Sequence, residues 1–315
     1  MKIAVPDLIS PSYFPAEAAV TLGFFADEGI DARLDLISPI EKAYEALRNG
    51  DIDIVAGSAH SALSAFPRWK GVKLLCAQSQ GMYWFLVMRA DLRAQRGDLS
   101  VVKGRRIGAA PWVGLCLRQL LIEGGIDPDR DGVTIMPTPG SLDEKVNFGV
   151  AAARALEQGV IDGFWANGMG AEIAIRAGVG TLVLDVRRGD GPKAGFNYTM
   201  ATLAATDRLI AEQPKKIAGA VRAIAAAQLA IQKDVQLAEN VATKLFPQDS
   251  SHIVELVRRD LPFYRSDLSR LFIEGMNRFA RTINILDRDV PYSEVVAEQF
   301  SEYWYKSSPP NPSFD

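Results

Sequence analysis

Cysteine and histidine are scarce in this sequence, with two residues of each among 315. Cys76 and Cys116 stand among apolar neighbours, which is typical of small core residues and not of a disulfide or a metal site. The sequence also lacks a phosphate-binding loop, a spaced cluster of metal ligands and a Ser/His/Asp arrangement. We therefore predict no metal site and no bound cofactor.

Long hydrophobic runs and an excess of basic residues are missing as well. No apolar run approaches the roughly 18 residues that cross a membrane. At the N-terminus Lys2 leads into a short apolar stretch that Pro6 closes, where a secretory signal would have an apolar run of about 7–15 residues. The sequence as written predicts a cytoplasmic protein without a membrane span, and a trimmed N-terminus would predict a periplasmic one. A net charge of −3 argues against a nucleic-acid-binding face.

The chain contains one pattern written twice. Residues Ala46–Asp53 read ALRNGDID, and Ala155–Asp162 read ALEQGVID, so that Ala-Leu, Gly and Ile-Asp recur at the same spacing. Each copy is typical of a helix that Gly closes and that a strand follows at once. We predict these strands over Ile52–Ala56 and Ile161–Ala166.

Three further matches precede these copies in the same order. They are a strand that starts with a basic residue, a Gly-Ile-Asp turn and a capping box, in which Ser and a Glu three residues later satisfy the first N–H groups of a helix. The pairs are Lys2–Val5 with Arg106–Ala109, Gly29–Asp31 with Gly125–Asp127, and Ser38–Glu41 with Ser141–Glu144. The sequence therefore predicts two copies of strand–helix–strand–helix–strand.

Strands that alternate with helices predict an α/β protein with two mostly parallel sheets flanked by helices. Strands are also expected over Tyr83–Met88 and Phe196–Met200. Tyr83 and Trp84 would then face opposite ways. After Pro214 the chain is mostly helical, with an apolar stripe formed by Ile217, Val221, Ile224 and Ile231.

Ligands of such sheets bind beyond the carboxyl ends of the strands. The residues that follow the predicted strands are therefore our candidate ligand-binding residues. The first copy supplies Ser10, Ser12, Tyr13, Ser58, His60 and Ser61, and the second supplies Trp112, Trp165, Asn167, Asn197 and Tyr198. Backbone N–H groups at a helix start near Ser58–Ser61 could hold an anion.

Several of these residues have more than one interpretation. His60 could contact a ligand, pack in the interior or act as an acid/base, and His252 is expected to be structural or exposed. Trp112 and Trp165 could be core residues, but their positions after strand ends favour lining a binding site. Asp53 and Asp162 could form a carboxylate pair, although capping of a neighbouring loop is favoured because each lies inside a predicted strand.

The segment Leu22–Asp31, LGFFADEGID, resembles the signature of the solute-binding proteins of ABC importers. The branch is the sulfonate/nitrate/taurine group, which includes proteins for the thiamine pyrimidine precursor (NMT1/THI5-like). Gly50–Ser58 and Asp162–Trp165 resemble later segments of the same family, and the likeness covers roughly residues 2–235. It implies a two-lobed, type II periplasmic-binding-protein-like fold with a helical C-terminal region. It also implies crossings near Met88 and Tyr198, so that residues 1–88 and 199–315 form lobe 1 and residues 89–198 form lobe 2.

This chain departs from the family where Pro111–Gly114 places Trp112 in a turn that often carries hydroxyls. We therefore predict capture of a small aromatic or heteroaromatic molecule with an acidic or polar group, in a cleft between the lobes. The resemblance implies an ABC-importer permease as a partner. The alternative is a cytoplasmic enzyme that uses His60 as acid/base, although the cysteine cluster of the related pyrimidine synthases is missing. The effector domain of a transcription regulator would need a helix-turn-helix before the first strand, which begins at residue 2.

Overall fold

The computed structural model describes residues 1–138, 141, 147–245, 247 and 250–305. The chain forms two compact units, which are described separately below. Unit 1 comprises Met1–Gly81 and Thr199–Asp315, and unit 2 comprises Met82–Tyr198. The chain first passes from unit 1 to unit 2 between Gly81 and Met82, earlier than the crossing expected near Met88. The reason is that the strand Phe85–Arg89 pairs in the sheet of unit 2.

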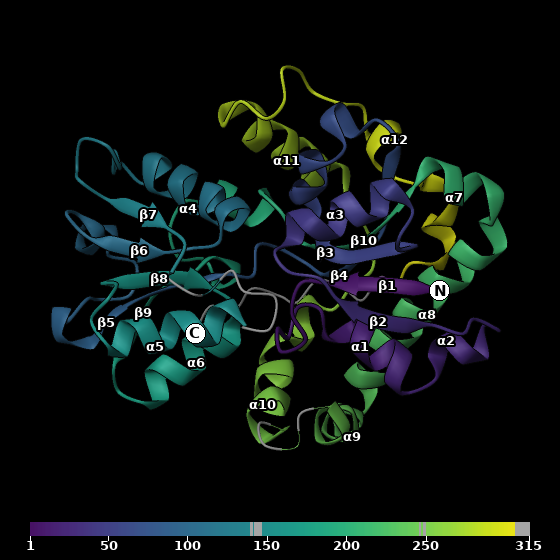
Figure 1. Cartoon of the computed structure of the whole chain (residues 1–315), viewed down its shortest axis with the longest axis horizontal. Coiled ribbons are helices and arrows are strands. Elements are labelled where there is room, and N and C mark those ends of the chain that lie inside the picture. Colours follow the sequence, from purple (N-terminus) through teal and green to yellow (C-terminus); the bar gives the residue numbers. More distant parts are fainter. Residues whose placement is uncertain (139–140, 142–146, 246, 248–249, 306–315) are drawn as a thin grey trace. The chain divides into compact units, whose positions relative to one another are not determined.

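Unit 1 is built on a five-stranded sheet (Figure 1). Its strands are β1 (Lys2–Val5), β2 (Arg33–Leu36), β3 (Ile54–Ser58), β4 (Val72–Ser79) and β10 (Ala201–Thr206). The strand order is β2-β1-β3-β10-β4, with β1 parallel to β2 and β3, and with β10 antiparallel to both of its neighbours. Every residue of β3 is buried, which places the core of unit 1 around this central strand.

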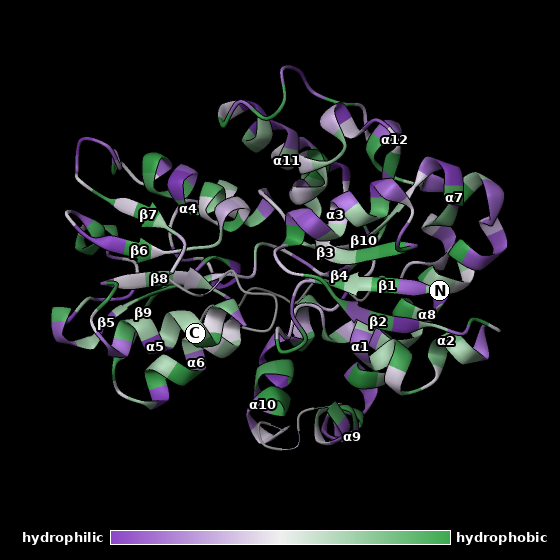
Figure 2. Ribbon diagram, viewed as in Figure 1, coloured by the Kyte–Doolittle hydropathy of each residue, from purple (hydrophilic) through white to green (hydrophobic). Residues whose placement is uncertain are grey.

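Helices flank the sheet of unit 1. They are α1 (Phe14–Thr21), α2 (Phe24–Asp27), α3 (Ile40–Asn49), α7 (Asp207–Glu212), α8 (Pro214–Lys233), α9 (Gln236–Leu245), α10 (Ser250–Asp260), α11 (Arg270–Thr282) and α12 (Tyr292–Val295). Helix α8 packs against α1 and β4. Its predicted apolar stripe is confirmed, since Ile217, Val221, Ile224 and Ile231 are fully buried. Figure 2 shows hydrophilic and hydrophobic residues on the same outer helices, as expected of helices with one face on a sheet.

Unit 2 repeats this plan with a second five-stranded sheet. Its strands are β5 (Phe85–Arg89), β6 (Arg106–Gly108), β7 (Thr134–Met136), β8 (Gly163–Ala166) and β9 (Gly180–Asp185), and its helices are α4 (Pro111–Glu123), α5 (Phe148–Glu157) and α6 (Gly168–Arg176). The strand order β7-β6-β8-β5-β9 matches that of unit 1 position by position, with the antiparallel β5 in the place of β10. The predicted internal repeat is therefore confirmed, and its two first strands lie in different sheets.

The repeated glycines close equivalent helices. Gly50 (φ +83°) ends α3 and Gly159 (φ +70°) follows α5, in a left-handed conformation that residues with a Cβ rarely adopt. The same hydrogen bond spans each turn: the N–H of Asp51 donates to Ala46 O and the N–H of Val160 donates to Ala155 O, both at 2.9 Å. The repeated spacing in the sequence therefore encodes a repeated helix stop.

The repeated aspartates fasten the first strand of each unit to the third. The N–H of Lys2 donates to Asp53 Oδ2 at 2.8 Å, and the N–H of Arg106 donates to Asp162 Oδ2 at 2.9 Å. In return the N–H of each aspartate donates to the carbonyl of the same basic residue, at 3.0 and 2.8 Å. Both aspartates lie one residue before their strands and not inside them, and the favoured capping role is confirmed.

The predicted capping box at Ser38–Glu41 is wrong. Helix α3 begins at Ile40 after Pro39, so Ser38 lies too early in the chain, and no side chain caps the helix start. Of the second box, residues 142–144 lie outside the described residues. Helix α5 begins later than that box predicts, and Asn147 caps it by accepting a hydrogen bond from the N–H of Val150 at 3.2 Å.

Two predicted strands begin later than expected. Tyr83 and Trp84 precede β5, and because their backbone is not part of the strand their rings contact each other with centroids 4.8 Å apart. Their predicted opposite orientation is therefore wrong. Residues Lys193–Asn197 form a short 3₁₀ helix, and β10 begins only at Ala201, so the strand expected over Phe196–Met200 is also wrong.

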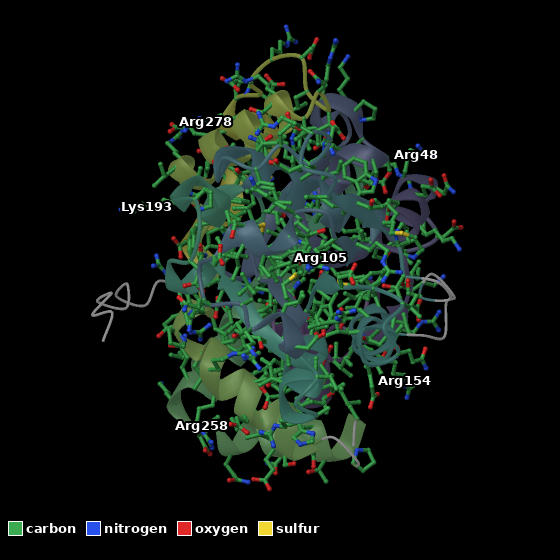
Figure 3. All side chains as sticks on the ribbon, turned by 90° about the vertical axis from the view of Figure 1, so that its left-hand side faces the viewer. Arg48, Arg105, Arg154, Lys193, Arg258 and Arg278 are labelled. Carbon is green, nitrogen blue, oxygen red and sulfur yellow. The ribbon has the colours of Figure 1, made fainter. Side chains whose placement is uncertain are left out.

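Basic residues lie on several elements, and both cysteines lie in the core. The basic side chains labelled in Figure 3 include Arg48 on α3, Arg258 on α10 and Arg154 on α5, which are separate elements. Cys76 and Cys116 are buried core residues, as predicted. Among the described helices, none combines the length and the apolar character that a membrane crossing requires.

We expect Asp162→Ala to lower the free energy of unfolding by about 2 kcal/mol, because a largely buried carboxylate loses bonds to the N–H and guanidinium of Arg106. Burial raises the pKa of Asp162, but the hydrogen bonds and charge of Arg106 outweigh it and leave the pKa lowered. The contribution should therefore be complete above about pH 4, the unfolded pKa, and should vanish as the pH falls through the lower folded pKa. Urea unfolding at several pH values measures it.

Asp91→Ala is the matched control, because Asp91 pairs with Arg89, as Asp162 also does, but is exposed. Its effect should stay within about 0.5 kcal/mol. Equal losses in the two variants, or a loss in Asp162→Ala that does not shrink in acid, would contradict the fastening role.

Candidate functional site

The loop that follows β1 contributes three of the predicted residues. Ser10, Ser12 and Tyr13 are all buried at the carboxyl end of this strand. Asp7 Oδ1 accepts hydrogen bonds from the N–H groups of Ile9 and Ser10, at 3.1 and 2.6 Å, and so shapes the loop. The loop is also anchored from the C-terminal helical region, where the Tyr264 hydroxyl donates to Pro11 O at 2.6 Å. The sequence predicted that these residues follow the first strand, and in the structure they are buried in the loop after β1.

The residues after β3 satisfy one another. The Ser58 and Ser61 hydroxyls are buried and lie 2.6 Å apart, and the Tyr44 hydroxyl donates to Ser58 O at 3.0 Å. The following helix, Ala59–Ser64, is a six-residue 3₁₀ helix. The N–H of Ala59 donates to Met200 O at 3.0 Å, and the N–H of His60 approaches Thr199 Oγ1 at 3.4 Å. Because unit 1 itself uses these N–H groups, we no longer expect them to hold an anion.

His60 is fully buried. Its ring lies edge-on to Phe279 of α11, with centroids 5.7 Å apart. Of the three interpretations open for His60, packing in the interior agrees with this contact from α11. The burial favours a packing role over acid/base chemistry.

Aromatic rings gather in unit 2 where β8 ends and β5 begins. Trp165 is fully buried and lies edge-on to Trp84, with centroids 6.5 Å apart, and Trp84 contacts Tyr83. The guanidinium carbon of Arg187, a residue only 5% exposed, lies 5.5 Å from the centre of the Tyr83 ring. The buried indole Nε1 of Trp165 has no hydrogen-bond acceptor within the described chain.

Asn167, another candidate of unit 2, has a local structural role. Asn167 caps α6 by accepting a hydrogen bond from the N–H of Gly170 at 3.1 Å. Helix α5 approaches this cap so closely that a Cβ at Gly149 would lie 2.4 Å from Asn167 Oδ1. Trp112 is half-buried in the first turn of α4.

The residues at the end of unit 2 differ in exposure. Asn197 is half-buried and ends the 3₁₀ helix, whereas Tyr198 is buried. Burial and a hydrogen bond to Glu123 raise the pKa of the Tyr198 hydroxyl, which stays protonated at neutral pH.

The predicted residues thus separate into six in unit 1 and five in unit 2. Sequence reasoning missed Arg187, which follows β9, and Glu17, which is fully buried on α1. The signal for Glu17 was available, because it is the one charged residue in an otherwise apolar stretch, Phe14–Val20. Arg187 gave no such signal, since Arg188 follows it and basic pairs are common on surfaces.

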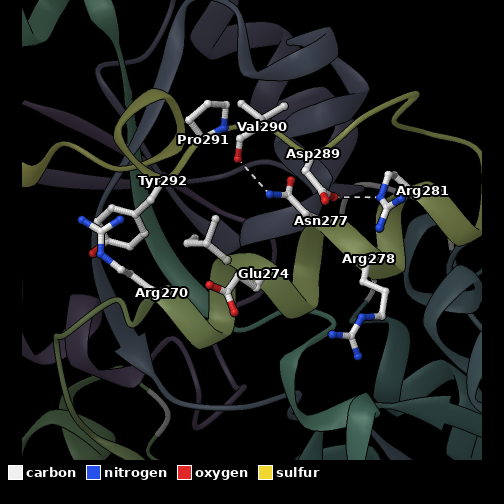
Figure 4. Close-up of a pocket in the computed structure, with 10 residues that line it drawn as sticks. Arg270, Glu274, Asn277, Arg278, Arg281, Asp289, Val290, Pro291 and Tyr292 are labelled. Atoms are coloured by element: carbon white, nitrogen blue, oxygen red, sulfur yellow. Dashed lines mark hydrogen bonds and ion pairs between the residues drawn. The ribbon is translucent and has the colours of Figure 1, made fainter.

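Two of the cavities in the described part of the chain have linings that include none of the predicted residues. One of about 210 Å³ lies in unit 2 at the start of α4 and has an apolar lining of Ala109, Ala110, Pro111, Gly114, Ile135 and Pro137 together with Arg118. The other, of about 450 Å³, lies on α11 and the segment after it in unit 1 (Figure 4). Two pairs of its polar groups interact: Asn277 Nδ2 donates to Val290 O at 2.8 Å, and Arg281 lies 2.7 Å from Asp289. Neither cavity groups acidic, His or Cys residues as a metal site would, and no such group occurs in the described chain.

Comparison with known proteins decides the family. A sequence profile of the family described as "NMT1/THI5 like" matches residues 10–236 of the 315. This chain belongs to that family. No curated protein sequence matches it. As a member of the family it has the two-lobed fold that the sequence predicted, and the solved structures similar to it agree.

Three of these structures illustrate the likeness. A protein from Bordetella bronchiseptica RB50 is 19% identical with a TM-score of 0.75, covering 96% of this chain and 95% of that chain. The periplasmic aliphatic sulphonate binding protein SsuA from Escherichia coli is 12% identical with a TM-score of 0.69, covering 94% and 91%. The desulfurization enzyme DszB, solved with biphenyl-2-sulfinic acid, is 15% identical with a TM-score of 0.67, covering 96% and 97%. At these identities the likeness concerns the fold.

We expect His60→Ala to lower the free energy of unfolding by about 2–4 kcal/mol, because it leaves a cavity beside Phe279. His252→Ala is the natural control, since it changes the chain's other histidine on a half-exposed face of α10, and it should have little effect. Urea unfolding of the two variants makes the comparison. A folded His60→Ala protein as stable as the wild type would contradict the packing role and restore His60 as a functional candidate.

Proposed function

We propose that this chain reversibly binds a small aromatic or heteroaromatic molecule that carries an acidic or strongly polar group. The binding residues would lie at the carboxyl ends of its strands. The observation that carries the proposal is the buried indole N–H of Trp165, which has no acceptor in the described chain. A buried donor without a partner costs about 1–3 kcal/mol, so a ligand acceptor at this position would stabilise the folded protein.

The surroundings of Trp165 support an aromatic ligand with an acidic group. Trp84 and Tyr83 extend the aromatic surface, and ring contacts contribute roughly 0.5–1.5 kcal/mol beyond the area they bury. Arg187 brings a positive charge to the same group of rings. Its planar guanidinium suits carboxylate and sulfonate oxygens, and these also accept a hydrogen bond from an indole N–H.

Membership of the NMT1/THI5-like family supports the binding of a small molecule. The sulphonate-binding protein of Escherichia coli shares the fold, and delivery of the ligand to an ABC-importer permease is the partner interaction that we propose. DszB shows that an enzyme can use this fold, but full burial of His60 against Phe279 gives an acid/base role no support here.

A thermal-shift screen tests the proposal. The compounds are aromatic carboxylates, aromatic sulfonates and pyrimidines, with nitrate and sulfate as small-anion controls. A true ligand at a hundredfold excess over its Kd should stabilise the folded state by about 2.7 kcal/mol. Tighter binding of nitrate or sulfate than of every aromatic compound would contradict the proposal.

Trp165→Phe tests the residue that carries the proposal. The change keeps an aromatic ring but removes the N–H donor, so we expect the affinity for the best aromatic ligand to fall about tenfold, or 1.4 kcal/mol. Trp69→Phe is the matched control, because Trp69 is also a buried indole without an acceptor in the described chain but lies in unit 1, after β3. Isothermal titration calorimetry should find unchanged affinity in Trp69→Phe, and equal losses in both variants would argue against a contact at Trp165.

A further inference from the structure

Glu17 is a fully buried carboxyl group without a hydrogen-bond partner in the described part of the chain. Its exposure is 0%, and both Oε1 and Oε2 lack a donor in the described residues. Buried side-chain oxygens nearly always have a partner, and each exception calls for an explanation. A carboxyl group with two unsatisfied oxygens costs the folded state more than an apolar side chain of the same size would. The chain therefore carries a destabilising group on α1 that its own packing does not use.

The position of Glu17 relates it to the predicted ligand-binding residues. It lies in the first turn of α1, directly after the loop of Ser10, Ser12 and Tyr13, and its N–H approaches Tyr13 O at 3.5 Å. The Ser10 Oγ at the start of this loop is also buried and without a partner in the described chain. Backbone hydrogen bonds at Tyr13 thus connect Ser10 with the first turn of α1, and both Ser10 and Glu17 have buried side-chain oxygens without a partner among the described residues.

The charge around Glu17 decides which ligand group suits it. Burial raises its pKa well above the usual range, and the nearby Asp7 carboxylate raises it further. No basic side chain contributes to this shift. An anionic ligand group would be repelled by Asp7 and would offer Glu17 no hydrogen to accept. An N–H donor would satisfy a carboxyl oxygen whether Glu17 is protonated or ionised.

We infer that Glu17 and Ser10 form an acceptor subsite for an N–H donor on the ligand. This inference rests on the proposed function and extends it: the bound molecule would carry an amino-type N–H donor, which Glu17 and Ser10 of unit 1 would accept. Glu17 then acts as a specificity-determining residue, which selects compounds with a donor over apolar compounds of the same shape.

Matched pairs of benzoates test the subsite. The 2-, 3- and 4-aminobenzoates and the corresponding methylbenzoates have nearly the same shape, and each pair differs in the presence of N–H donors. We expect wild-type protein to bind the amino compound of at least one pair tenfold or more tightly than its methyl partner. Glu17→Met, an apolar change of similar length, should abolish this preference and leave the affinity for the methyl compound unchanged. Isothermal titration calorimetry measures all six affinities.

Two further variants keep the test decisive. Glu17→Gln retains an acceptor oxygen and should retain part of the preference even if Glu17→Met folds poorly. Glu45→Met, on an exposed face of α3, is the control for an unspecific effect of removing a glutamate and should leave the preference intact. Without ligand, Glu17→Met should melt about 2 °C or more above the wild type, because it removes an unsatisfied buried carboxyl.

Three results would overturn the inference. They are the lack of an amino preference in all three pairs, a preference that persists in Glu17→Met, and a marked fall in the melting temperature of both Glu17 variants. The last result would show that Glu17 supports the fold. If all six benzoates fail to bind while another compound of the broader screen binds, the acceptor subsite is overturned and the proposed function stands. If nothing in that screen binds, both are overturned.

Discussion

The fold of each unit depends on how its first and third strands are joined. In unit 1, Ile3 pairs with Ile54, and in unit 2, Ile107 pairs with Gly163. In both cases an aspartate directly before the third strand exchanges hydrogen bonds with the basic residue that starts the first strand. A slip of one residue would turn every side chain to the opposite face, so a fixed register is needed to bury the strands. The Ile-Asp repeat supplies that fixed point twice.

The register also decides which loops and side chains lie together at the carboxyl ends of the strands. Parallel strands in a common register end at one edge of the sheet, and loops with side chains of functional interest start there. In unit 1 this edge bears Ser10, the start of α1 and the 3₁₀ helix after β3. In unit 2 it bears the rings of Trp84 and Trp165 and the guanidinium of Arg187. Among the described residues, the buried oxygens of Ser10 and Glu17 in unit 1 and the buried indole N–H of Trp165 in unit 2 have no hydrogen-bond partner.

Buried side chains that have partners in the described chain can be distinguished from buried polar groups that have none, and the second kind are our candidates for ligand binding. Ser58 and Ser61 pair with each other, Asn167 caps a helix and His60 packs against Phe279, so these residues are explained by the fold itself. Glu17 and the Trp165 indole are not explained in this way, because the described chain gives them no partner. Exposed polar residues cannot be distinguished in this way, because water provides their hydrogen-bond partners. Buried polar groups without a hydrogen-bond partner in the described chain are therefore the best candidates for contacts with a ligand.

The sequence by itself determined the elements that local physics controls. Gly50 and Gly159 mark helix ends because a left-handed turn excludes most residues with a Cβ, and the repeated spacing revealed the duplication. The family signature and the alternation of strands and helices settled the architecture. Only the tertiary structure decided which side chains those elements cover. Burial of His60 depends on α11, a helix more than 200 residues away in the chain, and the contact of Tyr83 with Trp84 depends on where β5 begins to pair. Glu17 could be seen in the sequence as a charge in an apolar stretch, but its lack of a partner is a property of all the elements packed around it, which no local pattern encodes.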